Sequence, residues 1–481
     1  MFYIGGGELM TRQAKVVILG AGTAGMTALK EVQRYTDDVL LINAGPYGTT
    51  CARVGCMPSK ALLEVAHAYG RRDWLAASGI RGTDTLEADL ASVMAHVRKL
   101  RDGFVAGPIS TAEALGERSI HGQPRFLDAT TLEVNGERIK AEAVIIATGT
   151  RPNLPEAWRS FGDRVVTSDE VFELKSPGRR VGVVGLGPMG VELGQAFAQL
   201  GCEVHAFTRG ESVAGLHDPD VNQSLIDVLE GQMSVNTGAD VTLRKGSYGV
   251  VMQGGGQEVE VDWVLASLGR RPNVEGLGLE NLGVALDKRG VPAFDAKTLR
   301  IGELPVFIAG DVDGLRPLLH EAADAGRIAA YHALHPNAEC LARRTPQGIV
   351  FTEPGAGYAG LIGAKLPSSG VVTGSVDFTR QGRAVTAGRN AGRLTLYADE
   401  RDGRLLGAEM VAPDAEHLLH LLAWSIQQQL NVDQLLEMPF YHPTVEEGLR
   451  SALQGVRREL GKRRTQPDLP LCHEPANAAL C

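Results

Sequence analysis

One unit occurs twice in the chain, and this duplication constrains the fold more than any other feature. In both copies a short apolar run ends in three glycines with the spacing GxGxxG, and a helical stretch and a second apolar run follow. The glycines are Gly20, Gly22 and Gly25 in the first copy and Gly185, Gly187 and Gly190 in the second. Glycines at these positions permit a tight turn and let a pyrophosphate approach the N-terminus of the helix. Because strand, helix and glycine spacing agree in both copies, the sequence predicts two βαβ dinucleotide-binding units.

The rest of the chain supplies further strands. Segments 143–149 (AVIIATG), 264–269 (VLASLG) and 306–311 (VFIAGD) are apolar runs that stop at glycine, as do parallel strands whose carboxyl ends face a ligand. After residue 347, the alternating segments 393–397 and 405–411 flank an Asp-Gly turn, which predicts an antiparallel hairpin. Helical patterns cover 414–430 and 444–460. The predicted class is therefore α/β, with two Rossmann-like dinucleotide-binding domains and a C-terminal α+β domain.

The length of 481 residues is enough for three or four domains. We expect an N-terminal extension, a first dinucleotide-binding domain in two parts, a second one between them, a last domain, and a flexible tail without assigned structure. The expected ranges are, in chain order, 1–11, 12–153, 154–275, 276–346, 347–461 and 462–481.

Charge and hydropathy exclude several classes of partner. The formal net charge is −9, and no basic stretch suggests binding to nucleic acid or to a membrane surface. The apolar runs are far shorter than the roughly 20 residues of a membrane helix. The N-terminus lacks the pattern of a secretory signal, so we expect a cytoplasmic protein.

Two of the six cysteines lie close together in the segment TTCARVGCMPSK (49–60). In a regular helix Cys51 and Cys56 would be about 7.5 Å apart along the axis, farther than the Cα atoms of a disulfide. A bond between them requires an irregular backbone, for which Gly55 gives the freedom. We expect Pro58 in the first turn of a helix over 59–68, so that Cys56 lies at its N-terminus, where a thiolate is favoured. A zinc site would need two more ligands, which no nearby Cys or His pair offers, so no metal is expected.

These features together resemble the flavoprotein disulfide reductases, the family of dihydrolipoyl dehydrogenase, glutathione reductase and mercuric reductase. The resemblance rests on the two βαβ units, CARVGCMPSK, the ATG and AGD strand ends, and HPTVEE (442–447), and it covers residues 12–461. It is greatest to dihydrolipoyl dehydrogenase. It implies FAD in the first unit, NADPH or NADH in the second, and a homodimer formed through the last domain. The implied substrate is a small-molecule or lipoyl-type disulfide or dithiol.

The resemblance also implies roles for single residues. Cys56 would face the flavin, and Cys51 would exchange with the substrate through a mixed disulfide. Lys60 would lie near the flavin with Glu192 as its ion-pair partner. An acid/base from the other subunit completes this set: a histidine oriented by a carboxylate, here His442 and Glu447.

Cofactor contacts follow in the same way. For FAD they are Gly20, Gly22, Gly25, Asn43, Thr50, Lys60, Thr148, Gly149, Gly310 and Asp311. For the nicotinamide nucleotide they are Gly185, Gly187, Gly190, Thr208, Arg209 and Gly269.

The chain departs from the family pattern at the end of the second strand of each unit. Asn43 and Thr208 stand where an acidic residue usually binds the ribose. Arg209 follows Thr208 and could bind a 2′-phosphate, which favours NADPH. Against this, Gly190 is typical of NADH sites, and a second arginine six residues after Arg209 is missing, because position 215 is glycine.

Further departures leave the substrate open. Tyr441 directly precedes His442, with Phe440 before it, where dihydrolipoyl dehydrogenases usually have a second histidine two residues before the catalytic one. An NADPH-dependent reductase of another disulfide or of a metal ion such as Hg(II) is the alternative enzyme, and a flavoprotein redox sensor with low turnover is the alternative of another class.

The four remaining cysteines carry weaker expectations. Cys472 and Cys481 in the tail could relay electrons or be incidental, and Cys202 and Cys340 are expected to be packing residues.

Overall fold

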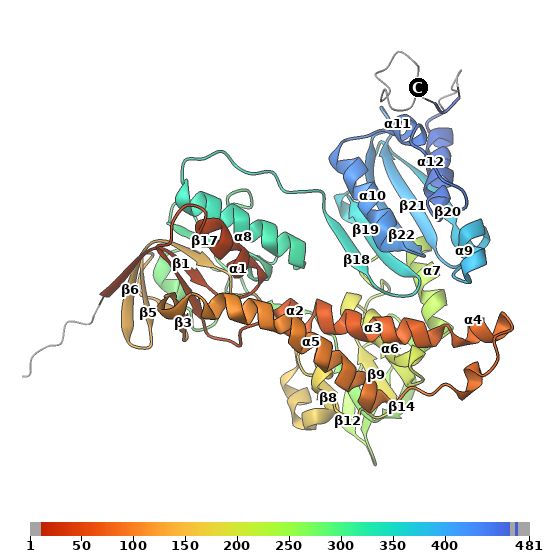
Figure 1. Cartoon of the computed structure of the whole chain (residues 1–481), viewed down its shortest axis with the longest axis horizontal. Coiled ribbons are helices and arrows are strands. Elements are labelled where there is room, and N and C mark those ends of the chain that lie inside the picture. Colours follow the sequence, from red (N-terminus) through yellow and green to blue (C-terminus); the bar gives the residue numbers. More distant parts are fainter. Residues whose placement is uncertain (1–10, 462–466, 470–481) are drawn as a thin grey trace, which may run out of the picture.

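The computed structural model describes residues 11–461 and 467–469. The expected extension up to Met10 and tail residues 462–466 and 470–481, which include Cys472 and Cys481, lie outside the described residues. Figure 1 shows the first domain on the left, the last domain at the upper right, and long helices that run from the former beneath the latter. Within the described ranges, no helix combines the length and apolar character needed to cross a membrane.

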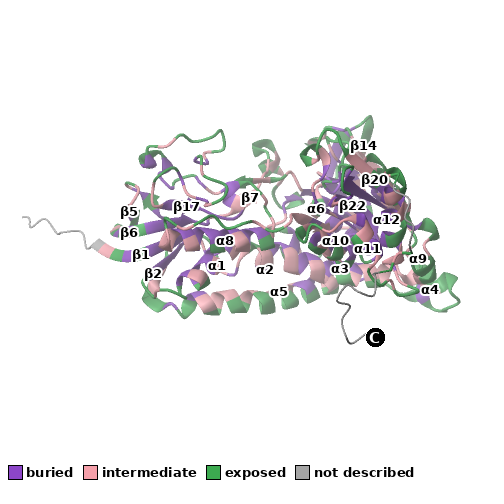
Figure 2. Ribbon diagram, turned by 90° about the horizontal axis from the view of Figure 1, so that it is seen from above, coloured by how far each residue is buried: buried purple, intermediate pink, exposed green. Residues whose placement is uncertain are grey.

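The first domain is built on a sheet of order β3-β2-β1-β6-β5-β4, with β17 paired to β6. Strands β3, β2, β1, β6 and β17 pair in parallel, and β4 and β5 add an antiparallel extension. Its helices α1 and α8 pack against each other, and Figure 2 shows them beside the buried strands. The bounds are β1 Thr11–Leu19, α1 Thr23–Val32, β2 Val39–Asn43, β3 Ser119–His121, β4 Arg125–Phe126, β5 Thr131–Val134, β6 Glu137–Ile146, β17 Val306–Ile308 and α8 Leu319–Leu334.

The second domain repeats this plan with a parallel sheet of order β11-β10-β9-β15-β8. A three-stranded antiparallel sheet, β12-β13-β14, is inserted before β15, and the short pair β7 and β16 connects the two domains. The bounds are β7 Thr150–Pro152, β8 Val165–Val166, β9 Arg180–Val184, α6 Pro188–Gln199, β10 Glu203–Phe207, α7 Pro219–Glu230, β11 Ser234–Asn236, β12 Thr242–Lys245, β13 Val250–Gly254, β14 Gln257–Val261, β15 Trp263–Ala266 and β16 Arg270–Pro272.

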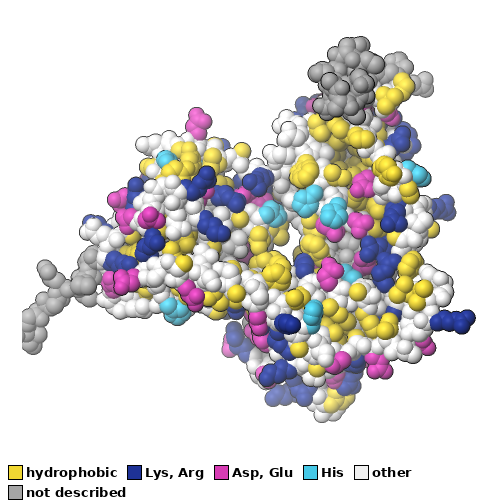
Figure 3. Space-filling model, in the orientation of Figure 1, with side chains coloured by type: hydrophobic (Ala, Val, Ile, Leu, Met, Phe, Trp, Pro, Cys, Tyr) yellow, Lys and Arg dark blue, Asp and Glu magenta, His cyan; other side chains and the backbone are white. Residues whose placement is uncertain are grey.

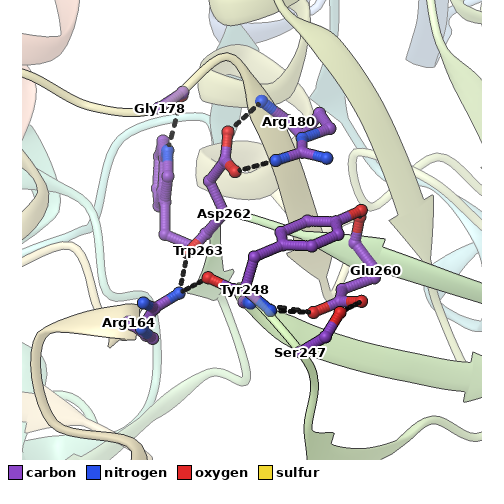
Figure 4. A network of polar contacts seen from close by, with 9 residues as sticks. Arg164, Gly178, Arg180, Ser247, Tyr248, Glu260, Asp262 and Trp263 are labelled. Atoms are coloured by element: carbon purple, nitrogen blue, oxygen red, sulfur yellow. Dashed lines mark hydrogen bonds and ion pairs between the residues drawn. The ribbon is translucent and has the colours of Figure 1, made fainter.

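A polar network attaches the inserted sheet to the parallel sheet (Figure 4). Asp262, between β14 and β15, accepts hydrogen bonds from the Arg180 main chain at 3.0 Å and from its guanidinium at 2.6 Å. The same guanidinium lies 4.0 Å from the centre of the Tyr248 ring. On the other side of this ring, the Glu260 carboxylate accepts from the N–H groups of Tyr248 and Gly249. The network holds the insert at the start of β9, away from the glycine turn at the other end of that strand.

The last domain is an antiparallel sheet of order β18-β19-β22-β21-β20. The predicted hairpin is confirmed as β21 and β22, whereas the helix expected from 444 begins only at Glu447, after a bend at His442-Pro443 and a turn at Val445-Glu446. The bounds are β18 Gln347–Val350, β19 Gly355–Gly360, β20 Val371–Asp377, α9 Gly382–Ala387, β21 Arg393–Asp399, β22 Leu405–Ala412, α10 Ala415–Gln427, α11 Val432–Leu436 and α12 Glu447–Glu459.

Four helices of the first domain bring the cysteine pair to the second domain. They are α2 Thr50–Val54, α3 Cys56–Gly70, α4 Arg72–Ala77 and α5 Leu90–Glu113. Helix α3 packs against α5 and against α6 of the second domain, and Leu62, Leu63 and Ala66 share a core with Phe197. Burial of these apolar side chains, at about 1.5–3 kcal/mol for each large one, fixes α3 between the two domains.

The two isolated cysteines differ in their environment. Cys202 is buried, as expected of a packing residue, and burial raises the pKa of its thiol to about 11. The expectation for Cys340 is wrong, because this side chain is exposed in the segment between α8 and β18.

Candidate active site

The backbone around the cysteine pair differs from the expected helix over 59–68. A short helix carries Cys51 and ends at Val54, Gly55 adopts φ −126° and ψ −117°, and α3 begins directly at Cys56. Pro58 falls in the first turn of α3, where a missing N–H costs nothing because the first four N–H groups of a helix have no acceptor within it. The irregularity is thus concentrated at Gly55, and Cys56 lies at the N-terminus of a 15-residue helix.

The two sulfurs are present as free thiols and interact with each other. A hydrogen bond from the Cys51 thiol, helped by the charge of Lys60, lowers the pKa of Cys56 to about 7 against the opposing effect of burial. The same hydrogen bond and burial raise the pKa of Cys51 far above its ordinary value. Cys56 is therefore the sulfur of the pair that loses its proton first, and Cys51 is the one that keeps it.

Lys60 and Glu192 form an ion pair that connects α3 with α6. Lys60 Nζ lies 2.9 Å from Glu192 Oε1 and 2.8 Å from Oε2. The Glu192 side chain is only 4% exposed, so the carboxylate is an element of the interior rather than an ordinary surface residue. It also accepts a hydrogen bond from the main-chain N–H of Phe351 at 2.9 Å.

His442 and Glu447 lie in the last domain, where α12 begins. The imidazole Nδ1 is 3.0 Å from Glu447 Oε1, and the Thr444 N–H donates to Oε2 at 3.2 Å. The hydrogen bond from His442 and, to a smaller extent, that from Thr444 lower the pKa of Glu447. The carboxylate therefore orients the ring, Nε2 has no hydrogen-bond partner among the described residues, and the His442 side chain is 80% exposed. Among the described residues of one chain, no hydrogen bond or ion pair joins His442 to Cys51 or Cys56.

The first glycine turn borders a cavity of about 530 Å³. A Cβ at Gly25 would lie 1.9 Å from the Gly20 carbonyl oxygen, so this position allows no side chain, and Gly20 has φ +110°. Of the expected FAD contacts, the cavity is lined by Gly20, Gly22, Asn43, Thr50, Thr148 and Gly149, but not by Gly25, Lys60, Gly310 or Asp311.

The cavity fits an extended dinucleotide. Its volume lies within the usual range for ligand pockets, and it opens at the N-terminus of α1. Two lining polar atoms, Thr148 Oγ1 and Arg53 Nε, are buried without a hydrogen-bond partner among the described residues. Buried polar groups are usually paired, so these two atoms indicate a ligand with hydrogen-bonding groups. Thr50 and Arg53 come from α2, so the helix that carries Cys51 forms one wall.

Two expected cofactor residues have partners within the protein. The Asn43 side chain accepts from the Ala21 N–H at 3.1 Å and donates to the Gly45 carbonyl at 2.6 Å, so it supports the glycine turn. Asp311 follows Gly310 at the end of β17, and Thr150, which lines the cavity, donates to its Oδ2 at 3.5 Å. Burial raises the pKa of Asp311.

The second glycine turn has the same internal geometry as the first. A Cβ at Gly190 would lie 1.9 Å from the Gly185 carbonyl oxygen, and nothing lies within 4 Å of one at Gly187. Gly269 follows β15 with φ +79°. Thr208 closes β10, and the exposed Arg209 pairs with Asp240, with Nε 2.6 Å from Oδ1.

Sequence reasoning missed Asp240 and Phe351, the partners of Arg209 and of the Lys60–Glu192 pair. Both are distant in sequence from the motifs they contact, and neither lies in a motif of its own.

In the described ranges, no three His, Cys, Asp or Glu side chains are grouped so as to hold a metal ion. The chemistry available at the site is thus that of a dithiol, a lysine–glutamate pair and a histidine–glutamate pair.

Comparison with known proteins agrees with this geometry. Residues 14–326 match the model of the pyridine nucleotide-disulphide oxidoreductases, and residues 346–453 match the dimerisation domain of these enzymes. The chain belongs to this family. Its members are FAD-dependent oxidoreductases that use NAD(P)H, and the dimerisation domain supports a homodimer.

Two kinds of relative are about equally similar to this pyridine nucleotide-disulphide oxidoreductase. A dihydrolipoyl dehydrogenase of Thermus scotoductus is 31% identical over 92% of this chain and 97% of the relative. A mercuric reductase of Staphylococcus aureus is 29% identical over 93% of this chain and 83% of the relative.

Solved structures share the fold. The HOCl-induced flavoprotein disulfide reductase RclA from Escherichia coli, in a Cu(II) complex, matches with a TM-score of 0.80 at 22% identity over 92% of this chain and 99% of that one. LpdA from Mycobacterium tuberculosis matches with a TM-score of 0.79 at 25% identity over 93% and 99%.

Proposed function

We propose that this protein moves electrons between NADPH and a thiol/disulfide substrate through Cys51 and Cys56, with a lipoyl-type dithiol or disulfide as the substrate class. The observation that carries the proposal is the placement of the pair: Cys56 begins α3, and Cys51 lies on α2, which borders the cavity. The hydrogen bond between the two thiols lowers the pKa of Cys56 to about 7 and raises that of Cys51, so Cys56 is the first to lose its proton. A pair of this kind beside a dinucleotide cavity is suited to redox exchange.

FAD, when bound in the cavity, would supply the transfer of an electron pair between the nicotinamide and the Cys51–Cys56 disulfide. In the reducing direction Cys51, once deprotonated, attacks one sulfur of the substrate disulfide and forms a mixed disulfide, and the other substrate sulfur leaves as a thiolate. Cys56 then attacks the Cys51 sulfur, which closes the protein disulfide and releases the second substrate thiolate. Two electrons have passed to the substrate, and NADPH restores the dithiol.

His442 of one protomer would serve the cysteine pair of the other. Its Nδ1 is bound to Glu447, and its Nε2 has no partner in the part of the chain that the structure describes, so the ring can accept the Cys51 proton and return it to the leaving thiolate. An exposed imidazole that a carboxylate holds in one orientation is suited to act on the cysteine pair of the other subunit. The exposed Trp424 and Tyr441 of the dimerisation domain are apolar groups that a partner would cover, and Figure 3 shows hydrophobic side chains on this domain.

The proposed nucleotide is NADPH. No carboxylate stands at position 208 to repel a 2′-phosphate, and Arg209 is 86% exposed at the end of β10. A phosphate would have to replace Asp240 as the partner of Arg209.

Anaerobic mixing with NADPH tests the assignment of Cys56. We expect a long-wavelength absorption band from the thiolate beside oxidised flavin. Because the pKa of Cys56 is about 7, the thiolate is the main form above this pH, so the band should be strong at pH 8 and weak at pH 6. Cys56→Ser should abolish it, and Cys51→Ser should retain it. A band that persists in Cys56→Ser would contradict the proposal.

Hg(II) reduction is the second candidate, because mercuric reductases are about as similar to this chain as dihydrolipoyl dehydrogenases. Turnover of NADPH with lipoamide, glutathione disulfide and Hg(II) distinguishes the candidates, and deletion of 465–481 tests whether Cys472 and Cys481 take part. A redox sensor remains the candidate of another class. The His442–Glu447 pair disfavours it, since a sensor needs no proton shuttle, and rapid turnover with any of these substrates would exclude it.

A further inference from the structure

Phe351 follows β18 of the last domain and contacts the Lys60–Glu192 pair in two ways. Its N–H donates to Glu192 Oε1 at 2.9 Å, and the centre of its ring lies 4.5 Å from Lys60 Nζ. The last domain therefore contributes both a donor and an aromatic face to an ion pair formed by the other two domains.

The main chain on both sides of this contact is held in place. His67 of α3 lies with Nε2 3.2 Å from the Phe351 carbonyl oxygen and with Nδ1 2.8 Å from the side-chain amide of Gln199. Glu353, two residues after Phe351, is bound by the fully buried Gln195 of α6. The Gln195 side chain donates to the Glu353 carbonyl at 2.9 Å and accepts from the Glu353 N–H at 2.8 Å. Helices α3 and α6 thus both bind the main chain of this segment, and the Phe351 side chain packs against the core that they share.

The contact matters because Lys60 is the less constrained partner of the pair. Its side chain is 30% exposed, whereas that of Glu192 is 4% exposed. An ammonium group beside an aromatic face gains roughly 0.5–1 kcal/mol where water can reach it. The hydrogen bond from Cys51 and, after it, the charge of Lys60 lower the pKa of Cys56, whereas burial and the charge of Glu192 raise it.

We propose that Phe351 is a positioning residue, whose ring and N–H hold the Lys60–Glu192 pair in place so that the ammonium charge acts on Cys56. This inference rests on the proposed function in taking Cys56 as the reactive thiolate. It assigns to the dimerisation domain a contact with the redox centre of its own chain, in addition to the histidine that it offers to the partner.

The test is the pH dependence of Cys56 alkylation by iodoacetamide in the reduced holoprotein, followed by mass spectrometry of the Cys56 peptide. In Phe351→Leu and Phe351→Met the midpoint should move to higher pH, and the rate at pH 6.5 should fall about two- to fivefold. Phe351→Tyr keeps the aromatic face and should titrate as the wild type. Methionine nearly conserves the buried volume, so it preserves the test if the leucine variant does not retain FAD. The dissociation constant for NADPH should not change.

Two controls make the result specific. Tyr248→Leu removes a comparable cation–aromatic contact, with Arg180, in the second domain and should leave the alkylation profile unchanged. Lys60→Met removes the ammonium and should give a larger change than either Phe351 variant. Suppose that Lys60→Met changes the alkylation profile. The role of Phe351 would then be overturned, and the proposed function left intact, if Phe351→Leu and Phe351→Met both had a wild-type profile or if Phe351→Tyr changed as much as they did. A normal profile in Lys60→Met, or a wild-type Cys56 that titrates as an ordinary thiol, would instead contradict the proposed site.

Discussion

The two dinucleotide-binding units agree at their glycines and differ where their second strand ends. In both, the third glycine lies so close to the carbonyl of the first that a Cβ would be 1.9 Å from its oxygen. At the strand end, however, the first unit has a buried Asn43 that is bonded to its own glycine turn, and the second has an exposed Arg209 paired with Asp240. Internal packing determines the glycines in both units, whereas the strand ends differ in the partners that their side chains have within the protein.

Alanine substitutions at the second and third glycines should have the largest effect and should separate packing from ligand binding. In Gly190→Ala the new Cβ meets backbone, so we expect a loss of stability of about 1–3 kcal/mol in thermal or urea unfolding and loss of NADPH binding. Gly187→Ala has room for a Cβ and should unfold as the wild type, yet bind NADPH weakly because the pyrophosphate approaches there. Gly25→Ala in the first unit should lose FAD. If Gly190→Ala were as stable as Gly187→Ala, the comparison of the two turns would fail.

A smaller effect is expected from Asn43→Ala. It leaves the Ala21 N–H without its partner, which costs about 1–3 kcal/mol, and FAD should dissociate at lower urea concentration. Thr208→Ala, at the matching position of the second unit, should change stability by less than about 0.5 kcal/mol. Flavin fluorescence during urea titration measures both variants. Equal losses would mean that the strand ends do not differ in the way described above.

The smallest effect concerns the exposed pair of the second unit. Asp240→Asn frees Arg209 and should lower the KM for NADPH about two- to fivefold, the range expected for an exposed ion pair, with the KM for NADH unchanged. Arg209→Ala should raise the KM for NADPH. Steady-state kinetics with both nucleotides measures this, and an Arg209→Ala variant with unaltered NADPH kinetics would show that Arg209 does not contact the nucleotide.

Much of this arrangement could be predicted from the amino-acid order because it depends on local geometry. The glycine spacing, the apolar runs before it and the hairpin after residue 392 are features of short segments, and the structure has strands β1, β9, β21 and β22 there. The position of Cys56 at a helix N-terminus belongs to the same group. Helix α3 begins three residues before the range 59–68 that the sequence predicts, because the first turn of a helix tolerates Pro58.

Only the tertiary structure decided the contacts between segments that are far apart in the chain. The burial of Glu192, the docking of Phe351 onto it, and the pairing of Arg209 with Asp240 depend on how three domains meet and on where a distant loop ends. Local patterns repeat every two to four residues and so report which face of an element is buried, but they do not say which other element covers it. The sequence by itself therefore determined the two nucleotide folds and the cysteine pair, and the domain packing determined which charges surround them.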